Sequence, residues 1–276
     1  MRRRGTGGII FTLTLATQGR SHLRRLILIA LVVLGAPPAR AELASRREAP
    51  RAVTIVVFGD SLAEGLWASL HRHFARDREA SLRVRVVNAT KASTGFNADA
   101  YDAALDRLLG RGGIDLLIVQ TGANDRQRAI ALDGHRVARF GTPRWFAFYS
   151  QRLGYFLAHV QQRRIPVLWV GLPVMRDEAF DRGMRVISRL QQHYAERHGA
   201  SFLDIAGFTG DADGLFFEKL AGAGGRLRQF RHADGVHFWE FGYDRVAAEV
   251  LATIRSRFPG LLPERQTRAE LLSHKP

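Results

Sequence analysis

The chain of 276 residues contains no cysteine. This absence excludes disulfide bonds, thiol nucleophiles and cysteine-ligated metal sites, so the stability of the fold has to come from its core. Three loop patterns are missing as well: the Gly-x-Ser-x-Gly nucleophile elbow, the phosphate-binding Gly-x-x-x-x-Gly-Lys loop and the Gly-x-Gly-x-x-Gly dinucleotide fingerprint. The sequence therefore argues against an ordinary α/β-hydrolase and offers no nucleotide-binding loop.

Acidic residues are few, with 26 against 41 lysines and arginines and a net charge of +15. Residues 1–41 hold seven arginines and no acidic residue, which leaves +8 on the remaining 235 residues. This excess favours an anionic envelope surface or an acidic polymer as the partner. Nucleic acid is the weaker interpretation, because the arginines are scattered and no zinc-finger, RNP or arginine-rich helix pattern is present.

The first 41 residues have the pattern of a secretory signal peptide. Arginines precede an apolar run from Leu26 to Leu34, and Ala39-Arg40-Ala41 follows as a cleavage site. The run is shorter than the roughly 20 residues of a membrane-spanning helix. We therefore expect a periplasmic or secreted protein. The alternative is an uncleaved N-terminal anchor that keeps the protein at the inner membrane.

Beyond a charged linker at 42–51, apolar runs alternate with helical patterns up to residue 258, and residues 259–276 form a C-terminal tail. Strands are expected at about 52–58, 82–88, 114–120, 165–171 and 200–205. Helices are expected near 62–77, 97–109, 144–163, 181–198 and 242–257. Continuous apolar strands indicate a sheet that is covered on both faces. The chain thus predicts one α/β domain at 52–258, a three-layer α/β/α sandwich around about five parallel strands.

Small polar motifs follow the expected strands at the edge where open α/β sheets bind ligands. They are Gly59-Asp60-Ser61 after the first strand, Ser93 to Asn97 with Gly95 after the second, Gly122-Ala123-Asn124-Asp125 after the third, and Asp234-Gly235-Val236-His237 past the fifth. Each motif alone is also an ordinary turn. Their order and their positions at the strand ends favour one shared site.

These motifs contain the groups that acyl transfer through a serine requires. A serine hydroxyl needs an imidazole to take its proton and a carboxylate to fix the imidazole tautomer, which Ser61, His237 and Asp234 can supply. A tetrahedral intermediate needs hydrogen-bond donors for its oxyanion. The backbone N–H groups of Ser61 and Gly95 and the side-chain amide of Asn124 are suitable donors.

With these four blocks in this order, the chain resembles the SGNH, or GDSL-like, hydrolase superfamily over about residues 52–258. The resemblance implies a flavodoxin-like SGNH fold and a serine esterase without a cofactor. It implies that Ser61 is the nucleophile, that His237 is the base and that Asp234 orients His237. Ser61, Gly95 and Asn124 would form the oxyanion hole. We assign Asp60 and Asp125 to structure, as acceptors that hold the catalytic turns.

Two further groups of residues bear on ligands. The other histidines at issue show no metal-ligand set, so we expect no metal site; they are His71, His73, His135, His159 and His232. The segment from Arg126 to Phe148 combines arginines with aromatic residues, which suits a carbohydrate or anionic substrate rim that includes Arg126 and Trp145. A packed surface segment is the alternative for this stretch.

The expected function is an O-deacylase, chiefly an O-acetyl esterase, acting on acylated envelope polysaccharide or peptidoglycan. Two alternatives remain at this point. The same residues serve an O-acyltransferase in which a sugar hydroxyl resolves the acyl-enzyme, or the fold serves as a non-catalytic envelope binding module. Lipid and small esters are not excluded. The sequence does not indicate the oligomeric state.

Overall fold

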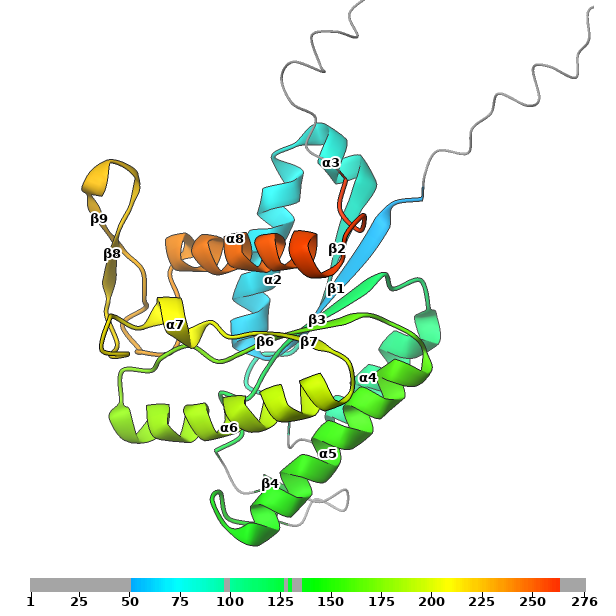
Figure 1. Cartoon of the computed structure of the whole chain (residues 1–276), viewed down its shortest axis with the longest axis vertical. Coiled ribbons are helices and arrows are strands. Elements are labelled where there is room, and N and C mark those ends of the chain that lie inside the picture. Colours follow the sequence, from blue (N-terminus) through cyan, green and yellow to red (C-terminus); the bar gives the residue numbers. More distant parts are fainter. Residues whose placement is uncertain (1–50, 97–99, 127–128, 131–135, 264–276) are drawn as a thin grey trace, which may run out of the picture. The chain divides into compact units, whose positions relative to one another are not determined.

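Five strands form one parallel sheet in the order β2-β1-β3-β6-β7 (Figure 1). The computed structural model describes residues 51–96, 100–126, 129–130 and 136–263. The strands are β1 (Val53–Gly59), β2 (Val84–Thr90), β3 (Leu116–Gln120), β6 (Val167–Val170) and β7 (Ser201–Leu203). The predicted five-stranded parallel sheet is confirmed. The expected signal peptide, residues 42–50 of the linker and the tail from residue 264 lie outside the described residues.

Helices cover both faces of the sheet, which gives the predicted three layers. The long helices are α2 (Ser61–Ala75), α4 (Ala100–Arg111), α5 (Pro143–Gln162), α6 (Glu178–Arg197) and α8 (Glu240–Arg257). Helices α2 and α8 cross and contact each other, whereas α5 contacts α4 and α6 (Figure 1). Among the described residues, no helix is long and apolar enough to span a membrane.

The core lies on both sides of the three central strands. All residues of β3 and β6 are buried, and only the first residue of β1 is partly accessible. Val57, Ile118 and Trp169 have no exposed surface. The continuous apolar runs in the sequence therefore mark strands packed under helices on both faces.

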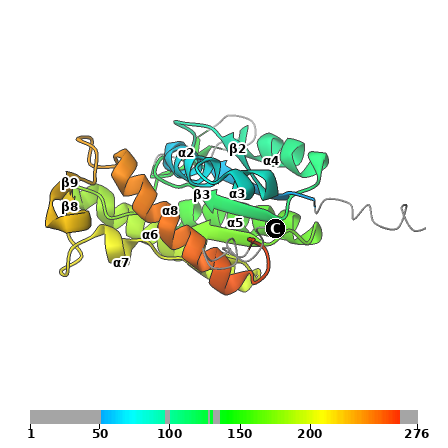
Figure 2. The ribbon, with the colours of Figure 1, turned by 90° about the horizontal axis from the view of Figure 1, so that it is seen from above.

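Several short elements were not predicted. Helix α3 (Arg78–Arg83) occupies the start of the expected strand at 82–88, because Asp77 caps it by accepting the N–H groups of Glu79 and Ala80. The other short elements are β4 (Ala129–Ile130), β5 (Arg136–Ala138), α7 (Ala206–Thr209), β8 (Lys219–Ala221), η1 (Ala223–Gly225) and β9 (Leu227–Gln229). The β8–β9 hairpin lies beyond the N-terminal end of α8 (Figures 1 and 2).

Gly59 allows the ends of β1 and β3 to approach closely. Its φ is 150°, and a Cβ atom at this position would lie 1.8 Å from the carbonyl oxygen of Gln120. The N–H of Asp60 donates to that same oxygen at 3.2 Å. A side chain at position 59 would therefore separate the two strand ends.

We expect Gly59→Ala to lower the free energy of unfolding by more than about 2 kcal/mol, because backbone has to move to accept the methyl group. Gly110→Ala is the matched control, since a Cβ atom at Gly110 in α4 would meet no atom within 4 Å. It should stabilise the helix by about 0.5–1 kcal/mol. Urea unfolding measures both effects, and equal stabilities for the two variants would contradict the close approach at Gly59.

Candidate active site

Ser61 is the first residue of α2 and follows directly on the buried carboxylate of Asp60. One oxygen of Asp60, Oδ1, accepts the N–H of Leu62 at 3.0 Å and caps the helix. The other oxygen, Oδ2, accepts the N–H of Gly122 at 3.0 Å. Asp60 thus joins the end of β1, the start of α2 and the turn after β3, and it fixes the backbone on which Ser61 stands.

Burial raises the pKa of Asp60 to about 6, and the backbone N–H donors oppose this rise. The carboxylate is therefore mainly ionised at neutral pH and accepts hydrogen bonds from two turns. This arrangement agrees with the structural role expected for Asp60.

Ser61, His237 and Asp234 form one series of hydrogen bonds. Ser61 Oγ lies 2.7 Å from His237 Nε2, and His237 Nδ1 lies 2.7 Å from Asp234 Oδ2. The serine and the histidine are 176 positions apart in the chain, so only the fold brings them together. About a third of the His237 side chain, 34%, is exposed, which leaves the ring accessible to solvent.

Asp234 shapes the turn that carries His237. Its Oδ1 accepts the backbone N–H groups of Val236 at 2.8 Å and of His237 at 2.9 Å. Partial burial raises the pKa of Asp234, but these donors and the His237 ring outweigh it and hold the pKa well below its usual range. An ionised Asp234 accepts a hydrogen bond from the N–H at Nδ1 of His237. In the neutral ring Nε2 then carries no proton, so it accepts the hydrogen bond from the Ser61 hydroxyl.

The motifs after β2 and β3 meet beside this series. Asn124 Nδ2 donates to the carbonyl oxygen of Thr94 at 3.2 Å, next to the peptide of Gly95. A Cβ atom on Gly95 would lie 2.3 Å from Asp125 Oδ1. Gly95 is therefore needed for a close approach between two turns, and the left-handed backbone in this loop is at Ser93, with a φ of 58°.

A buried polar network holds the turn after β3. Tyr149 of α5 donates its hydroxyl hydrogen to Asp125 Oδ2 at 3.0 Å. Gln191 of α6 donates to the Tyr149 hydroxyl at 3.0 Å and to the carbonyl oxygen of Thr121 at 2.9 Å. Burial raises the pKa of Tyr149 well above its ordinary value, so the phenol remains a donor. Asp125 acts as an acceptor that secures a turn, as expected.

A second histidine contacts the same carboxylate. His232 Nδ1 lies 3.3 Å from Asp234 Oδ2, and the His232 ring lies 4.8 Å from the ring of Trp239. Within the described residues, no group of three or more histidines and carboxylates is placed to hold a metal ion. His135 lies outside those residues.

Arg231 is a residue of the site that sequence reasoning missed. Its guanidinium is buried and donates to four backbone carbonyl oxygens, those of Val174 at 2.5 Å, Val236 at 2.8 Å, His237 at 3.3 Å and Gly235 at 3.4 Å. Burial lowers the pKa of Arg231 to about 10, so it stays charged at neutral pH. In a chain with 41 lysines and arginines, no sequence pattern singles this one out.

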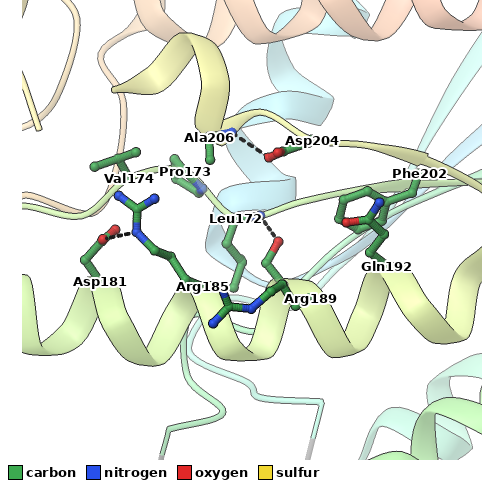
Figure 3. Close-up of a pocket in the computed structure, with 11 residues that line it drawn as sticks. Leu172, Pro173, Val174, Asp181, Arg185, Arg189, Gln192, Phe202, Asp204 and Ala206 are labelled. Atoms are coloured by element: carbon green, nitrogen blue, oxygen red, sulfur yellow. Dashed lines mark hydrogen bonds and ion pairs between the residues drawn. The ribbon is translucent and has the colours of Figure 1, made fainter. Parts of the chain in front are cut away.

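The loop after β6, which Arg231 contacts, is itself held from α6 and α7. Thr209 Oγ1 accepts the N–H of Val174 at 3.1 Å, and Asp181 Oδ1 accepts the N–H of Met175 at 2.8 Å. A pocket of about 220 Å³ lies between α6 and this loop. Figure 3 shows that Arg185, which lines it, is turned toward Asp181, and Arg185 Nε donates to Asp181 Oδ2 at 2.5 Å. The loop is a fixed support for the histidine turn.

Of the two predicted rim residues, one is exposed and the other is buried. Arg126 is exposed and lines an open pocket with Asn124. Trp145 has no exposed surface, and its ring stacks on Tyr149 at 4.7 Å. The expected rim position of Trp145 is therefore wrong, and the alternative of a packed segment holds there. The spacing of Trp145, Tyr149 and Leu153 marks the buried face of α5.

Comparisons with known proteins place the chain among SGNH folds. A family model described as "Protein of unknown function (DUF459)" matches residues 54–253. No curated protein matches the chain by sequence. Solved structures with the same fold include a variant of an acetyl xylan esterase from Geobacillus stearothermophilus, with 17% identity, a TM-score of 0.55, and coverage of 78% of this chain and 97% of that one.

Two further structures are similar. A lipase/acylhydrolase from Enterococcus faecalis is 20% identical with a TM-score of 0.51, over 78% of this chain and all of that one. A GDSL-like lipase from Bacteroides thetaiotaomicron is 13% identical with a TM-score of 0.52, over 80% of this chain and 96% of that one. At such identities the likeness concerns the fold, and the SGNH, GDSL-like fold that the motifs predict is confirmed.

We expect Arg231→Met to lower kcat for an ester substrate by about tenfold to a hundredfold with KM changed less than about twofold, because the turn that carries His237 loses its support. Arg231→Lys retains the positive charge but has fewer hydrogen-bond donors. Its kcat should therefore lie between those of the wild-type protein and Arg231→Met. Arg182→Met is the control, since Arg182 is 70% exposed and its one ion pair among the described residues is with Glu178. A destabilised Arg231→Met protein with wild-type kcat would contradict a positioning role.

Proposed function

Because the chain belongs to the family described as "Protein of unknown function (DUF459)", we propose its function from the site: a serine esterase that removes O-acyl groups, chiefly O-acetyl, from carbohydrate polymers of the cell envelope. One observation carries this proposal. The hydroxyl of Ser61, the ring of His237 and the carboxylate of Asp234 are joined by two contacts of 2.7 Å. This is the arrangement that activates a serine for attack on an ester.

The first half of the reaction forms an acyl-enzyme. Ser61 Oγ attacks the ester carbonyl carbon while His237 Nε2 takes the hydroxyl proton, and ionised Asp234 stabilises the resulting imidazolium. The N–H groups of Ser61 and Gly95 and the amide of Asn124 stabilise the oxyanion. One N–H of the Asn124 side-chain amide donates to the carbonyl oxygen of Thr94, which leaves the second N–H for the substrate.

Loss of the alcohol completes the acyl-enzyme: the bond to the alcohol breaks as His237 gives its proton to the leaving oxygen, and the acyl group stays on Ser61. The second half returns the serine. Water attacks the acyl group with His237 as the base, and the bond between the acyl carbon and Ser61 Oγ breaks as His237 gives that proton back to Oγ, so that the carboxylic acid leaves. Both halves use the same oxyanion donors, and neither needs a cofactor.

Three observations support an envelope carbohydrate as the substrate. The first 41 residues have the pattern of a signal peptide, which would export the protein to that compartment. The remaining chain carries a net charge of +8, which suits acidic polymers. A protein of this fold with a TM-score of 0.55 is an acetyl xylan esterase.

The serine mechanism predicts that residues 42–276 release p-nitrophenol from p-nitrophenyl acetate. Ser61→Ala and His237→Ala should each lower kcat by at least about a thousandfold, because each removes a group that acts only together with the other. The double variant should be no slower than either single variant by more than a small factor. Wild-type rates in a folded Ser61→Ala protein would exclude this mechanism.

The substrate assignment predicts a preference for short acyl groups. Across p-nitrophenyl esters from acetate to dodecanoate, kcat/KM should be highest for acetate, by about tenfold or more over octanoate. Acetate should also be released from O-acetylated cell-wall polysaccharide, but not by Ser61→Ala. Preference for octanoate or longer chains, without acetate release from the polymer, would instead identify a lipolytic esterase.

A further inference from the structure

An open pocket lies next to the amide that we assign to the oxyanion hole. It has a volume of about 450 Å³ and is lined by Ala123, Asn124, Arg126 and Phe180. Among the described residues that line it, Arg126 is the charged one and none is acidic. A group bound here would therefore meet a guanidinium and an aromatic ring immediately beside the acyl site.

The side chain of Arg126 is positioned by α6. Its stem crosses Gly183, where a Cβ atom would lie 3.1 Å from Arg126 Cδ and 3.4 Å from Nε. Its guanidinium carbon lies 6.0 Å from the centre of the Phe180 ring, at the limit of a cation–π contact. The absence of a side chain at Gly183 thus makes room for the arginine along the helix.

Arg126 makes no hydrogen bond or ion pair within the described part of the chain, whereas Arg185 of α6 and Arg152 of α5 do. Arg185 pairs with Asp181, and Arg152 pairs with Asp102. The acidic residues at the start of α6 are engaged elsewhere. Asp177 accepts the N–H of Phe180 as the helix cap, and Glu178 Oε2 lies 3.7 Å from Arg182 Nη1. The donors of Arg126 are therefore left for a ligand.

We propose that this pocket binds a carboxylate of the substrate, carried by an acidic sugar unit at or next to the acylated position. The inference rests on the proposed esterase function and names its substrate class. A planar guanidinium matches a carboxylate with two parallel hydrogen bonds. A single cation suits one negative charge, and Phe180, which lines the pocket beside Arg126, adds an apolar wall next to which the sugar ring can lie.

Under this proposal Arg126 is a specificity residue. Asn124 and Arg126 are two positions apart in the turn after β3, so an acyl carbonyl at the first and a carboxylate at the second belong to neighbouring parts of one substrate. The enzyme then discriminates between acidic and neutral acetylated polysaccharides. The expected preference is for polymers of uronic acids.

The test compares kcat/KM for two acetylated substrates of similar length, an oligogalacturonate and a xylo-oligosaccharide, by measuring released acetate. The wild-type protein should prefer the acidic substrate, and Arg126→Met should lower the ratio of acidic to neutral kcat/KM by about ten- to a hundredfold, the effect of a charge-assisted hydrogen bond. Arg126→Lys should retain part of the preference. Arg182→Met, which changes a neighbouring arginine outside the pocket, should keep the wild-type ratio.

An equal ratio in the wild-type and Arg126→Met proteins, with both substrates cleaved, would overturn this inference and leave the esterase function standing. Wild-type protein that cleaves neither substrate nor p-nitrophenyl acetate would overturn the proposed function, and the inference with it. Raising the salt concentration gives a second readout. The preference for the acidic substrate should weaken with salt, since screening reduces the attraction between exposed charges.

Discussion

The carboxylate of Asp60 is the interaction on which the site depends. It has no exposed surface, and it accepts N–H groups from Leu62 and Gly122, which belong to two different strand-to-helix connections. Without such partners a buried carboxylate costs several kcal/mol. Because the backbone supplies them, the same residue caps α2, sets the position of Ser61 and fixes the turn that continues to Asn124.

The histidine side of the site is built in the complementary way. There a buried cation, Arg231, gathers backbone carbonyl oxygens from the histidine turn and from the loop after β6. Asp60 thus holds backbone N–H groups in place, and Arg231 holds backbone carbonyl oxygens in place. Within the described residues, Asp60 forms no ion pair with a basic side chain and Arg231 forms none with an acidic one. Two rigid turns from distant parts of the chain consequently meet at the 2.7 Å contact between Ser61 and His237.

Much of this site follows from the sequence, because the essential groups stand in short motifs directly after apolar strands. The order of those motifs and the rule that strand ends share one edge favoured one shared site, and the resemblance to the SGNH hydrolases implied the roles of Ser61 and His237 within it. Arg231 did not follow, since its role lies in contacts with backbone carbonyl groups that leave no side-chain pattern. Trp145 was misplaced because an aromatic residue in an arginine-rich segment fits a rim and a helix core equally well, and burial separates the two.

The central claim is that Ser61 is a nucleophile activated by His237, and covalent labelling tests it most directly. The protein is incubated with an alkyl p-nitrophenyl phosphonate ester, digested and mapped by mass spectrometry. The account predicts one phosphonyl group per chain, on Ser61, and labelling that is slowed by orders of magnitude in His237→Ala. The account would be contradicted by a wild-type protein that stays unlabelled at Ser61. It would also be contradicted if Ser61 were labelled as fast in His237→Ala as in the wild-type protein.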